Sequence, residues 1–529
     1  MYKDNKILIA KNDNKDIFIE PKMANRHGLI AGATGTGKTV TLKVMAESFS
    51  DAGVPVFLAD IKGDLAATCL AGTMNENVQK RVDKLNLAPF DLHGYPVNFW
   101  DIYQEKGLPL RTTISEMGPL LLSRILGLND VQSDILTIVF KIADDQGLLL
   151  LDTKDLKSMI QYVGDNKDDF TLEYGNIAKQ SLGAIVRAIV ALEAEGGDKF
   201  FGETAINIAE WLCRDYSGKG IIQILDCQKL ILNPTMYSTF MLWLLSELFE
   251  TLPEAGDLDR PKMVFFFDEA HLLFDNASKE LVDKIEQTVK LIRSKGVGIY
   301  FITQVPSDIP DGVLGQLGNK VQHALRAYTP KEQKAAKAVA ESFRENKAFD
   351  TFDTLLELGV GEALVSVLDA KGVPTIVERA TILPPQSQMG ALDDNHRDQM
   401  IKNNMLYSRY SQEIDRESAY ELLTRKAESD KQLEAQQKQL AEIEKLKAKE
   451  AKELEKLAEK EAKAQEKQLQ KLQNARKKEV KKVVNSATGT IGRELGKAVG
   501  KSIGGTFGRT LGGNVGASLA RGIFNTLLK

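Results

Sequence analysis

The chain has 529 residues, 43% of them apolar and 27% charged, so it is long enough for several domains and too apolar to be largely disordered. Its cysteines, Cys69, Cys213 and Cys227, are widely separated, which argues against a disulfide framework or a zinc cluster. The first residues, MYKDNKILIA, lack the pattern of a signal peptide, and no stretch reaches about 18 consecutive apolar residues. We therefore expect a cytoplasmic protein.

Charge is unevenly distributed along the chain, although the formal net charge is only −4. Residues 421–529 carry 24 Lys and Arg against 14 Asp and Glu, which leaves residues 1–420 with 45 basic side chains against 59 acidic ones. An acidic body repels a polyanion over most of its surface. Any contact with nucleic acid is therefore expected in a local groove or in the basic C-terminal part.

Residues 1–385 alternate between apolar, β-rich runs and helical patterns, which predicts an α/β fold. Several runs are continuously apolar, as is typical of strands buried on both faces of a parallel sheet. Between about residues 110 and 211 helical periodicity dominates, and we interpret this stretch as a helical insertion. The predicted strands are Ile7–Ala10, Ile17–Ile19, Gly28–Ala31, Val54–Ala59, Gly220–Leu225, Met263–Phe267, Ile299–Thr303, Gln322–Ala327 and Glu362–Val367.

The body is expected to end near Pro385, with a polar linker over residues 386–415. Residues 416–484 are rich in Glu, Lys, Gln, Ala and Leu, which predicts a long charged helix. A heptad register of apolar residues runs through this helix, but charged residues interrupt it. A weak coiled coil and a solvated single helix therefore both remain open. The register residues are Leu440, Ile443, Leu454 and Leu457.

Residues 485–529 form a basic repeat in which an apolar residue recurs at every fourth position from Ile491 onward. Glycine follows each of the first seven apolar residues, and these glycines would cost an isolated helix about 6–7 kcal/mol relative to alanine. Glycines at this spacing allow another backbone to approach closely, while the basic positions suit a membrane surface. Docking on a protein or a sister tail, binding to a membrane, and disorder are the alternatives.

The strongest motif lies between the predicted strand Gly28–Ala31 and a helical run from Val40 to Phe49. It fits the pattern G-x-x-x-x-G-K-[ST], whose glycines let backbone N–H groups point at phosphates. The residues of this predicted phosphate loop are Gly32, Ala33, Thr34, Gly35, Thr36, Gly37, Lys38 and Thr39. Lys38 is expected to bridge β- and γ-phosphate oxygens, and the Thr39 hydroxyl to bind Mg²⁺.

Polar residues at the ends of other predicted strands complete this site. Asp268 follows the run Met263–Phe267 and suits the acid that holds Mg²⁺, while Glu269 suits the base that activates water. Gln304, at the end of the next run, suits an amide that contacts the γ-phosphate and the attacking water. Asp60 follows another strand, either to contact the waters of the metal or as a simple turn acid.

These motifs, in this order, resemble those of the HerA/FtsK group of P-loop ATPases, and most closely the bacterial HerA-like ATPases of the YjgR type. Further similar segments are Tyr237–Phe249 and Gly315–Pro330, so the resemblance covers most of residues 1–385. It implies a RecA-like core, Mg²⁺-dependent ATP hydrolysis and a hexameric ring. In such rings a neighbouring subunit supplies an arginine to the site. Arg326 is the candidate, with Arg293 as its rival, although either could be a structural ion-pair partner.

Two functions remain open at this point. The first is a ring ATPase that drives nucleic-acid translocation or unwinding. The second is an ATPase that acts on a protein or membrane-associated partner recruited through the C-terminal tail, without DNA translocation.

Overall fold

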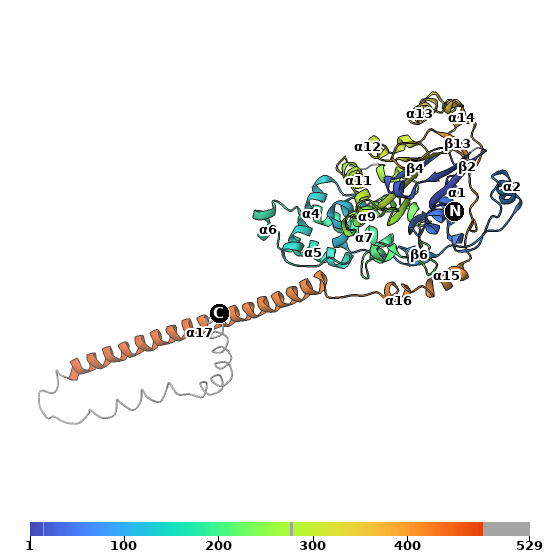
Figure 1. Ribbon diagram of the computed structural model, residues 1–529. Helices are drawn as coiled ribbons and strands as arrows, with labels where there is room; N and C mark the ends of the chain where they lie inside the picture. The colour runs from blue at the N-terminus through green and yellow to red at the C-terminus, as the bar shows by residue number, and fades with distance from the viewer. Residues whose placement is uncertain (14, 276–278, 480–529) are drawn as a thin grey trace. The chain divides into compact units, whose positions relative to one another are not determined.

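The computed structural model describes residues 1–13, 15–275 and 279–479 (Figure 1). The chain divides into two compact units, residues 1–429 and residues 430–529. The glycine repeat over 485–529 lies outside the described residues. No helix in the described ranges is both long enough and apolar enough to cross a membrane.

The first unit is built on one mixed sheet, which confirms the predicted α/β fold class. Within the described residues the sheet has 13 strands in the order β1-β2-β13-β12-β11-β4-β10-β9-β5-β8-β6-β7, with β3 paired to β2. The strands from β11 to β7 in this order run parallel, and the others join antiparallel. The strands are β1 (Tyr2–Lys3), β2 (Lys6–Asn12), β3 (Lys15–Ile19), β4 (Gly28–Ala31), β5 (Val56–Asp60), β6 (Val97–Asp101), β7 (Leu108–Pro109), β8 (Ile222–Asp226), β9 (Met263–Phe267), β10 (Val297–Thr303), β11 (Asn319–Gln322), β12 (Glu362–Ser366) and β13 (Glu378–Ile382).

Helices cover both faces of this sheet, and a group of helices, α3 to α8, lies between β7 and β8 in the chain. The helices of the body are α1 (Lys38–Asp51), α2 (Glu76–Lys84), α3 (Ile114–Ile125), α4 (Asp130–Asp145), α5 (Thr153–Asp165), α6 (Lys167–Tyr174), α7 (Lys179–Ala194), α8 (Gly197–Phe200), α9 (Pro234–Thr251), α10 (His271–Phe274), α11 (Lys279–Ile292), α12 (Asp311–Leu314), α13 (Pro330–Glu341) and α14 (Thr351–Glu357). The helices α13 and α14 lie side by side at one end of the unit (Figure 1).

The continuously apolar strands are explained by burial on both faces. On β9, Phe265 packs in one core together with Phe57 of β5, and their ring centroids are 5.3 Å apart. Phe266, the next residue, points to the other core, where its ring lies 5.2 Å from that of Tyr300. Because neighbouring side chains of a strand point to opposite faces, both must be apolar here. Apolar residues on both faces of β9 therefore fit its position in the middle of the sheet, between β10 and β5.

One predicted strand differs from the structure. The run Gln322–Ala327 was expected to be a strand throughout, but β11 ends at Gln322, and backbone hydrogen bonds to the segment after β4 continue to Ala324. Ala324 and Leu325 are apolar because they are buried in a third cluster together with residues of α13 and α14. The same pattern of apolar residues therefore serves helix packing here rather than a strand. The strands β1, β6, β7 and β13 are absent from the prediction.

Residues 386–415, expected to form a linker, instead contact the body, and we call this segment the strap. It contains α15 (Asp394–Lys402) and α16 (Tyr407–Tyr410). Arg397 forms an ion pair with Asp226, with 3.1 Å between Nη1 and Oδ2, and Tyr410 is fully buried beside Trp100. These contacts anchor the strap, although most of its residues are polar.

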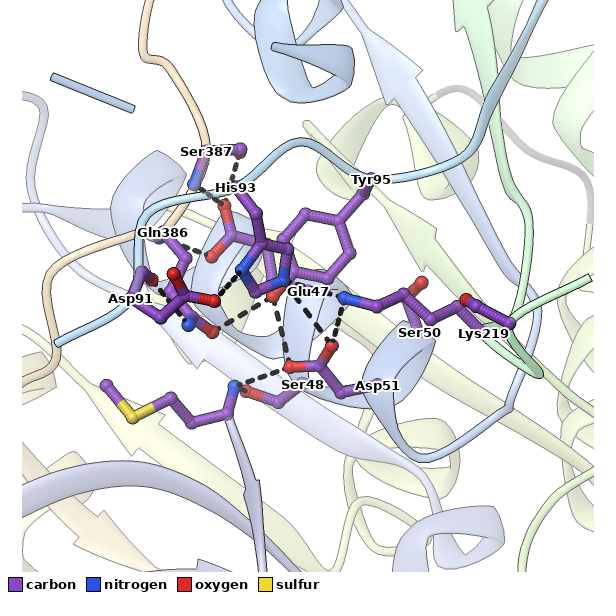
Figure 2. A network of polar contacts seen from close by, with 12 residues as sticks. Glu47, Ser48, Ser50, Asp51, Asp91, His93, Tyr95, Lys219, Gln386 and Ser387 are labelled. Atoms are coloured by element: carbon purple, nitrogen blue, oxygen red, sulfur yellow. Dashed lines mark hydrogen bonds and ion pairs between the residues drawn. The ribbon is translucent and has the colours of Figure 1, made fainter. Parts of the chain in front are cut away.

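The start of the strap is tied to α1 through the polar network drawn in Figure 2. The buried carboxylate of Glu47 accepts hydrogen bonds from the backbone N–H groups of Gln386 and Ser387, at 2.8 and 3.1 Å. One turn further along α1, Asp51 accepts hydrogen bonds from Tyr95 at 3.0 Å and from Lys219 at 2.8 Å. The helix that begins at the phosphate loop is therefore held at its far end by the buried Glu47 and the half-buried Asp51.

The long helix α17 spans Ala419–Glu479. Its first turn belongs to the body, where Ala419 is fully buried and the backbone N–H of Tyr420 donates to Asp155 at 2.8 Å. Further along, the apolar side chains of the heptad register are exposed on the helix surface, each by 48% or more. A coiled coil with a second copy would bury these side chains, and it stays a prediction.

Candidate functional site

The predicted phosphate loop connects β4 to α1 at the carboxyl edge of the parallel sheet. In the part of the chain that the structure describes, several of its backbone N–H groups donate to no acceptor, those of Thr34, Gly35, Gly37, Lys38 and Thr39. The last two open α1, where the dipole of the helix adds positive potential. Since adjacent free N–H groups at a helix start bind anions, this loop is a cradle for phosphate groups.

The carbonyl groups of the loop have partners that fix its curl. The Lys38 ammonium donates to the carbonyl oxygens of Gly32 and Ala33 at 2.7 and 3.3 Å. The Thr36 hydroxyl also donates to Ala33, at 2.7 Å, and the Thr36 carbonyl accepts from the backbone N–H of Gly361 at 2.9 Å. With its carbonyls engaged in this way, the loop leaves its N–H groups for a ligand.

Position 32 requires glycine because another part of the chain lies directly against it. The Cβ of any larger residue at Gly32 would lie 2.5 Å from the Cβ of His323, and the φ of Gly32 is +150°. The ladder of the sheet continues past this point, since Gly32 N–H donates to Gln304 at 3.2 Å and Ala33 N–H to Ala324 at 2.9 Å. Gly32, the first glycine of the motif, thus allows the chain to pass close to His323 where the loop leaves the sheet.

The acidic pair lies at the same edge of the sheet, at the end of β9. Glu269 has a φ of +48°, and its backbone N–H donates to the Asp268 carboxylate at 2.9 Å. The Glu269 carboxylate lies 3.4 Å from Nδ1 of His271. Ala270 N–H donates to the carbonyl of Ile302 at 2.9 Å, which ties the turn to β10. The backbone therefore turns sharply at this pair instead of continuing the strand.

Electrostatics connect the acidic pair to the phosphate loop. Burial lowers the pKa of Lys38, and the charges of Glu269 and Asp268 oppose this shift. Burial and the neighbouring Glu269 raise the pKa of Asp268 to about 6. A lysine and two carboxylates that act on each other at the mouth of an anion cradle are suited to bind a metal–phosphate complex.

The other predicted residues occupy different positions around the loop. Gln304 is exposed and follows β10, the strand that lies between β4 and β9, so it stands between the phosphate loop and the acidic pair. Arg326 is exposed in the segment after β11, and Arg293 is exposed after α11. Among the contacts of the described residues, neither arginine has a hydrogen bond or ion pair with the phosphate loop.

Asp60 is buried at the end of β5. Its carboxylate accepts hydrogen bonds from the N–H groups of Gly63 at 2.8 Å and Leu65 at 3.3 Å, which is the geometry of a turn acid. Burial, together with the acids Asp64 and Asp226, raises its pKa to about 7. These hydrogen bonds fit the second of the two roles expected from the sequence, that of a turn acid, and the contact to the waters of the metal stays a prediction.

His323 and Tyr237 lie in the two further segments that resemble the HerA-like ATPases, but the contacts of their side chains could not be predicted from the sequence. Nδ1 of His323 donates to the carbonyl of Glu362 at 2.9 Å, so its Nε2 accepts from the Thr41 hydroxyl at 2.8 Å. Burial lowers the pKa of His323 to about 4, which keeps the ring neutral. The side chain thus connects α1 to the antiparallel strands behind the loop. No periodicity or spacing signals such a role.

The donor set fits a nucleotide with a divalent cation. The cradle offers free N–H groups and the Lys38 ammonium to phosphates, while the Thr39 hydroxyl and the Asp268 carboxylate are oxygen donors of the kind Mg²⁺ prefers. No group of three or more His, Cys, Asp or Glu in the described ranges could hold a metal by itself.

Comparisons with known proteins show the family to which the chain belongs. The model of the family "Helicase HerA-like C-terminal" matches residues 5–511. The DNA double-strand break repair helicase HerA of Sulfurisphaera tokodaii is 21% identical over 385 residues, which are 72% of this chain and 70% of the relative. A probable helicase of Methanocaldococcus jannaschii, MJECL08, is 33% identical over 120 residues, covering 22% of this chain and 21% of the relative.

Two solved structures resemble the chain at TM-scores below 0.5. VirB4 of Thermoanaerobacter pseudethanolicus covers 71% of this chain and 97% of its own, with 16% identity and a TM-score of 0.44. The plasmid coupling protein TrwB in complex with ADP and Mg²⁺ covers 69% of this chain and 89% of its own, with 16% identity and a TM-score of 0.43.

The cradle between β4 and α1, with the acidic pair at the end of β9, defines a P-loop nucleoside triphosphatase. The chain belongs to the HerA-like helicase C-terminal family, whose model spans residues 5–511, and it is a P-loop ATPase. The predicted membership in the HerA/FtsK group is confirmed.

Proposed function

We propose that the protein hydrolyses ATP with Mg²⁺ as a hexameric ring and uses the energy to translocate or unwind nucleic acid. The observation that carries the proposal is the cradle of free N–H groups in the described phosphate loop, whose Lys38 is electrostatically coupled to Asp268 and Glu269. Membership in the HerA-like family and the similarity to a DNA repair helicase supply the nucleic-acid part.

Each residue of the site has a specific part in this proposal. The N–H groups of the loop and Lys38 hold the phosphates, and the Thr39 hydroxyl and Asp268 hold Mg²⁺, which would neutralise charge on the transferred phosphate. Glu269 accepts a proton from the attacking water, and Gln304 orients that water. The positive φ of Glu269 turns its side chain away from the strand direction.

The ring requires a cation supplied in trans, for which we propose Arg326. Its side chain is exposed and is therefore accessible to a neighbouring subunit. Mixing the R326A and K38A variants tests this role, because a ring with both contains sites with an intact loop beside an intact arginine. We expect ATPase activity to reappear in the mixture. R293A in place of R326A is the control for the rival arginine, and activity that never reappears with R326A contradicts the assignment.

Nucleic acid is tested by measuring ATPase rates with duplex DNA, single-stranded DNA and RNA at several salt concentrations. A motor that follows the phosphate backbone should be stimulated, and the stimulation should weaken steeply with salt because binding releases counterions. K38A is the control for contaminating activity. Rates unaffected by any nucleic acid would contradict the motor and favour a protein or membrane partner. Deletion of residues 486–529 would then abolish assembly or localisation while sparing basal ATPase activity.

A further inference from the structure

The strand β12 begins directly behind the phosphate loop, and a glycine there lies against the loop backbone. Gly361 N–H donates to the carbonyl of Thr36 at 2.9 Å, and its Cα lies 3.2 Å from the position that a Cβ on Gly37 would occupy. The carbonyl of Gly361 in turn accepts from Ile382 N–H at 2.9 Å. The curl of the phosphate loop therefore depends on where this residue of the antiparallel extension is held.

A side chain from a distant helix holds that residue. Nη1 of Arg81, on α2, donates to the carbonyl oxygens of Gly361 at 3.2 Å and Ile382 at 3.1 Å. Its Nη2 donates to the carbonyl of Val360 at 3.4 Å. The planar guanidinium thus bridges the turn before β12 and the end of β13, and a single ammonium cannot reproduce this fork.

The environment of Arg81 supports a fixed position. Burial lowers the pKa of its guanidinium, with the charge of Glu362 opposing the shift. Gly361 has a φ of +77°, and a Cβ there would lie 2.6 Å from Nη1 of Arg81. The neighbouring Val82 is buried, and Lys84 pairs with Glu362 at 3.6 Å, so α2 is docked against this same turn.

We propose that Arg81 is a positioning residue for nucleotide binding: through Gly361 and the Thr36 carbonyl it holds the phosphate loop in the shape that presents its N–H groups to the ligand. It does not touch the nucleotide. The proposal rests on the phosphate loop being the nucleotide site, as proposed above. Loss of this support should weaken binding of substrate and transition state alike, and should therefore change KM rather than kcat.

The test compares R81Q with K80Q in the full-length protein, using ATPase kinetics and the Kd of a fluorescent ATP analogue. Lys80 lies on the same helix but pairs with Glu76 at 2.5 Å, so K80Q removes the same charge without touching β12. We expect R81Q to raise KM and Kd about tenfold, as loss of a charge-assisted hydrogen bond would, with kcat changed less than about twofold. R81K should be intermediate, and K80Q should match wild type.

G361A supplies a second, independent variant. It should raise KM as R81Q does, and the double variant should be no worse than either alone, because both act through one contact. The proposal is overturned if the KM values of R81Q and R81K lie within about twofold of the KM of K80Q, even if the thermal midpoints of the two Arg81 variants fall. It is also overturned if the effects of R81Q and G361A on KM add fully. K38A distinguishes a failure of the Arg81 proposal from a failure of the proposed nucleotide site. If K38A binds the ATP analogue as tightly as wild type does, the nucleotide site itself is contradicted.

Discussion

The hydroxyl of Tyr237 on α9 donates a 2.6 Å hydrogen bond to the backbone carbonyl of Asp268, the residue at which β9 gives way to the acidic pair. Tyr237 is fully buried, and Asp268 is half-buried. The helix α9 therefore fixes the backbone of the residue that we propose to hold Mg²⁺. This contact connects the core directly to the edge of the sheet at which the acidic pair lies.

Removing this hydroxyl should loosen the acidic pair. Y237F leaves the Asp268 carbonyl without a buried donor, so we expect the free energy of unfolding to fall by about 1–2 kcal/mol. Since Asp268 would be less well placed, the concentration of Mg²⁺ needed for half-maximal ATPase activity should rise. Thermal unfolding and Mg²⁺ titrations measure the two effects. Y328F is the control, because Tyr328 is 82% exposed. A variant with an unchanged Mg²⁺ requirement would limit Tyr237 to a role in packing.

The proposed base can be separated from the binding residues. E269Q keeps the size of the side chain but cannot accept a proton, so ATP binding should persist while kcat falls about 10²–10⁴-fold. K38A should lose binding instead, because it removes the ammonium that we propose holds the phosphates. Binding of a fluorescent ATP analogue and steady-state ATPase rates distinguish these outcomes. If E269Q hydrolyses ATP at more than a tenth of the wild-type rate, another residue is the base.

Asp268 should make the nucleotide-free protein less stable as pH rises. Its folded pKa is about 6, whereas an unfolded aspartate titrates near about 3.9. Between these values the folded state binds more protons than the unfolded state, so its stability falls as pH rises through this window. D268N carries no such proton. It should match wild type near pH 4 and be more stable by about 2–3 kcal/mol above pH 7.

Thermal unfolding in buffer without magnesium or nucleotide measures this difference at each pH. D257N, which alters an exposed acid, is the matched control and should follow the wild-type profile. A stability difference between D268N and wild type that stays constant from pH 4 to 8 would contradict the expected titration.

The phosphate loop could be predicted from sequence because its function resides in local backbone geometry, which spacing encodes directly. Lys38 follows Gly37 by one residue, and the free N–H groups all lie within one loop and one helix start. Arg81 could not be predicted in this way, because its partner Gly361 lies 280 residues away and only the fold brings them together. A contact between side chain and backbone leaves no pattern in either segment.

Composition also failed to describe the strap, for a related reason. An average over residues 386–415 is polar, which predicts a linker, yet a few buried side chains decide where the segment lies. Tyr410 is fully buried and Arg397 is 4% exposed, and each has a partner on the body. Similarly, the apolar run after β11 was interpreted as a strand because periodicity cannot tell which neighbour covers an apolar residue.

The ion pair between Arg397 and Asp226 should be a principal anchor of the strap. R397M keeps an apolar side chain of similar length over Phe99 but leaves the Asp226 carboxylate buried without its cation, beside Asp60. We expect the free energy of unfolding to fall by about 3–5 kcal/mol. Adding D226N should restore at least half of this loss, because the uncompensated charge is then removed.

R409M is the control for that experiment. Arg409 also belongs to the strap, but its pair with Glu210 is solvent-exposed, with 49% of the arginine side chain accessible, so its loss should cost under about 1 kcal/mol. Proteolysis of the strap should follow the same order, with R397M cut fastest, because a released segment becomes accessible to protease. If R397M were as mild as R409M, the strap would be held by Tyr410 and the Glu47 network instead.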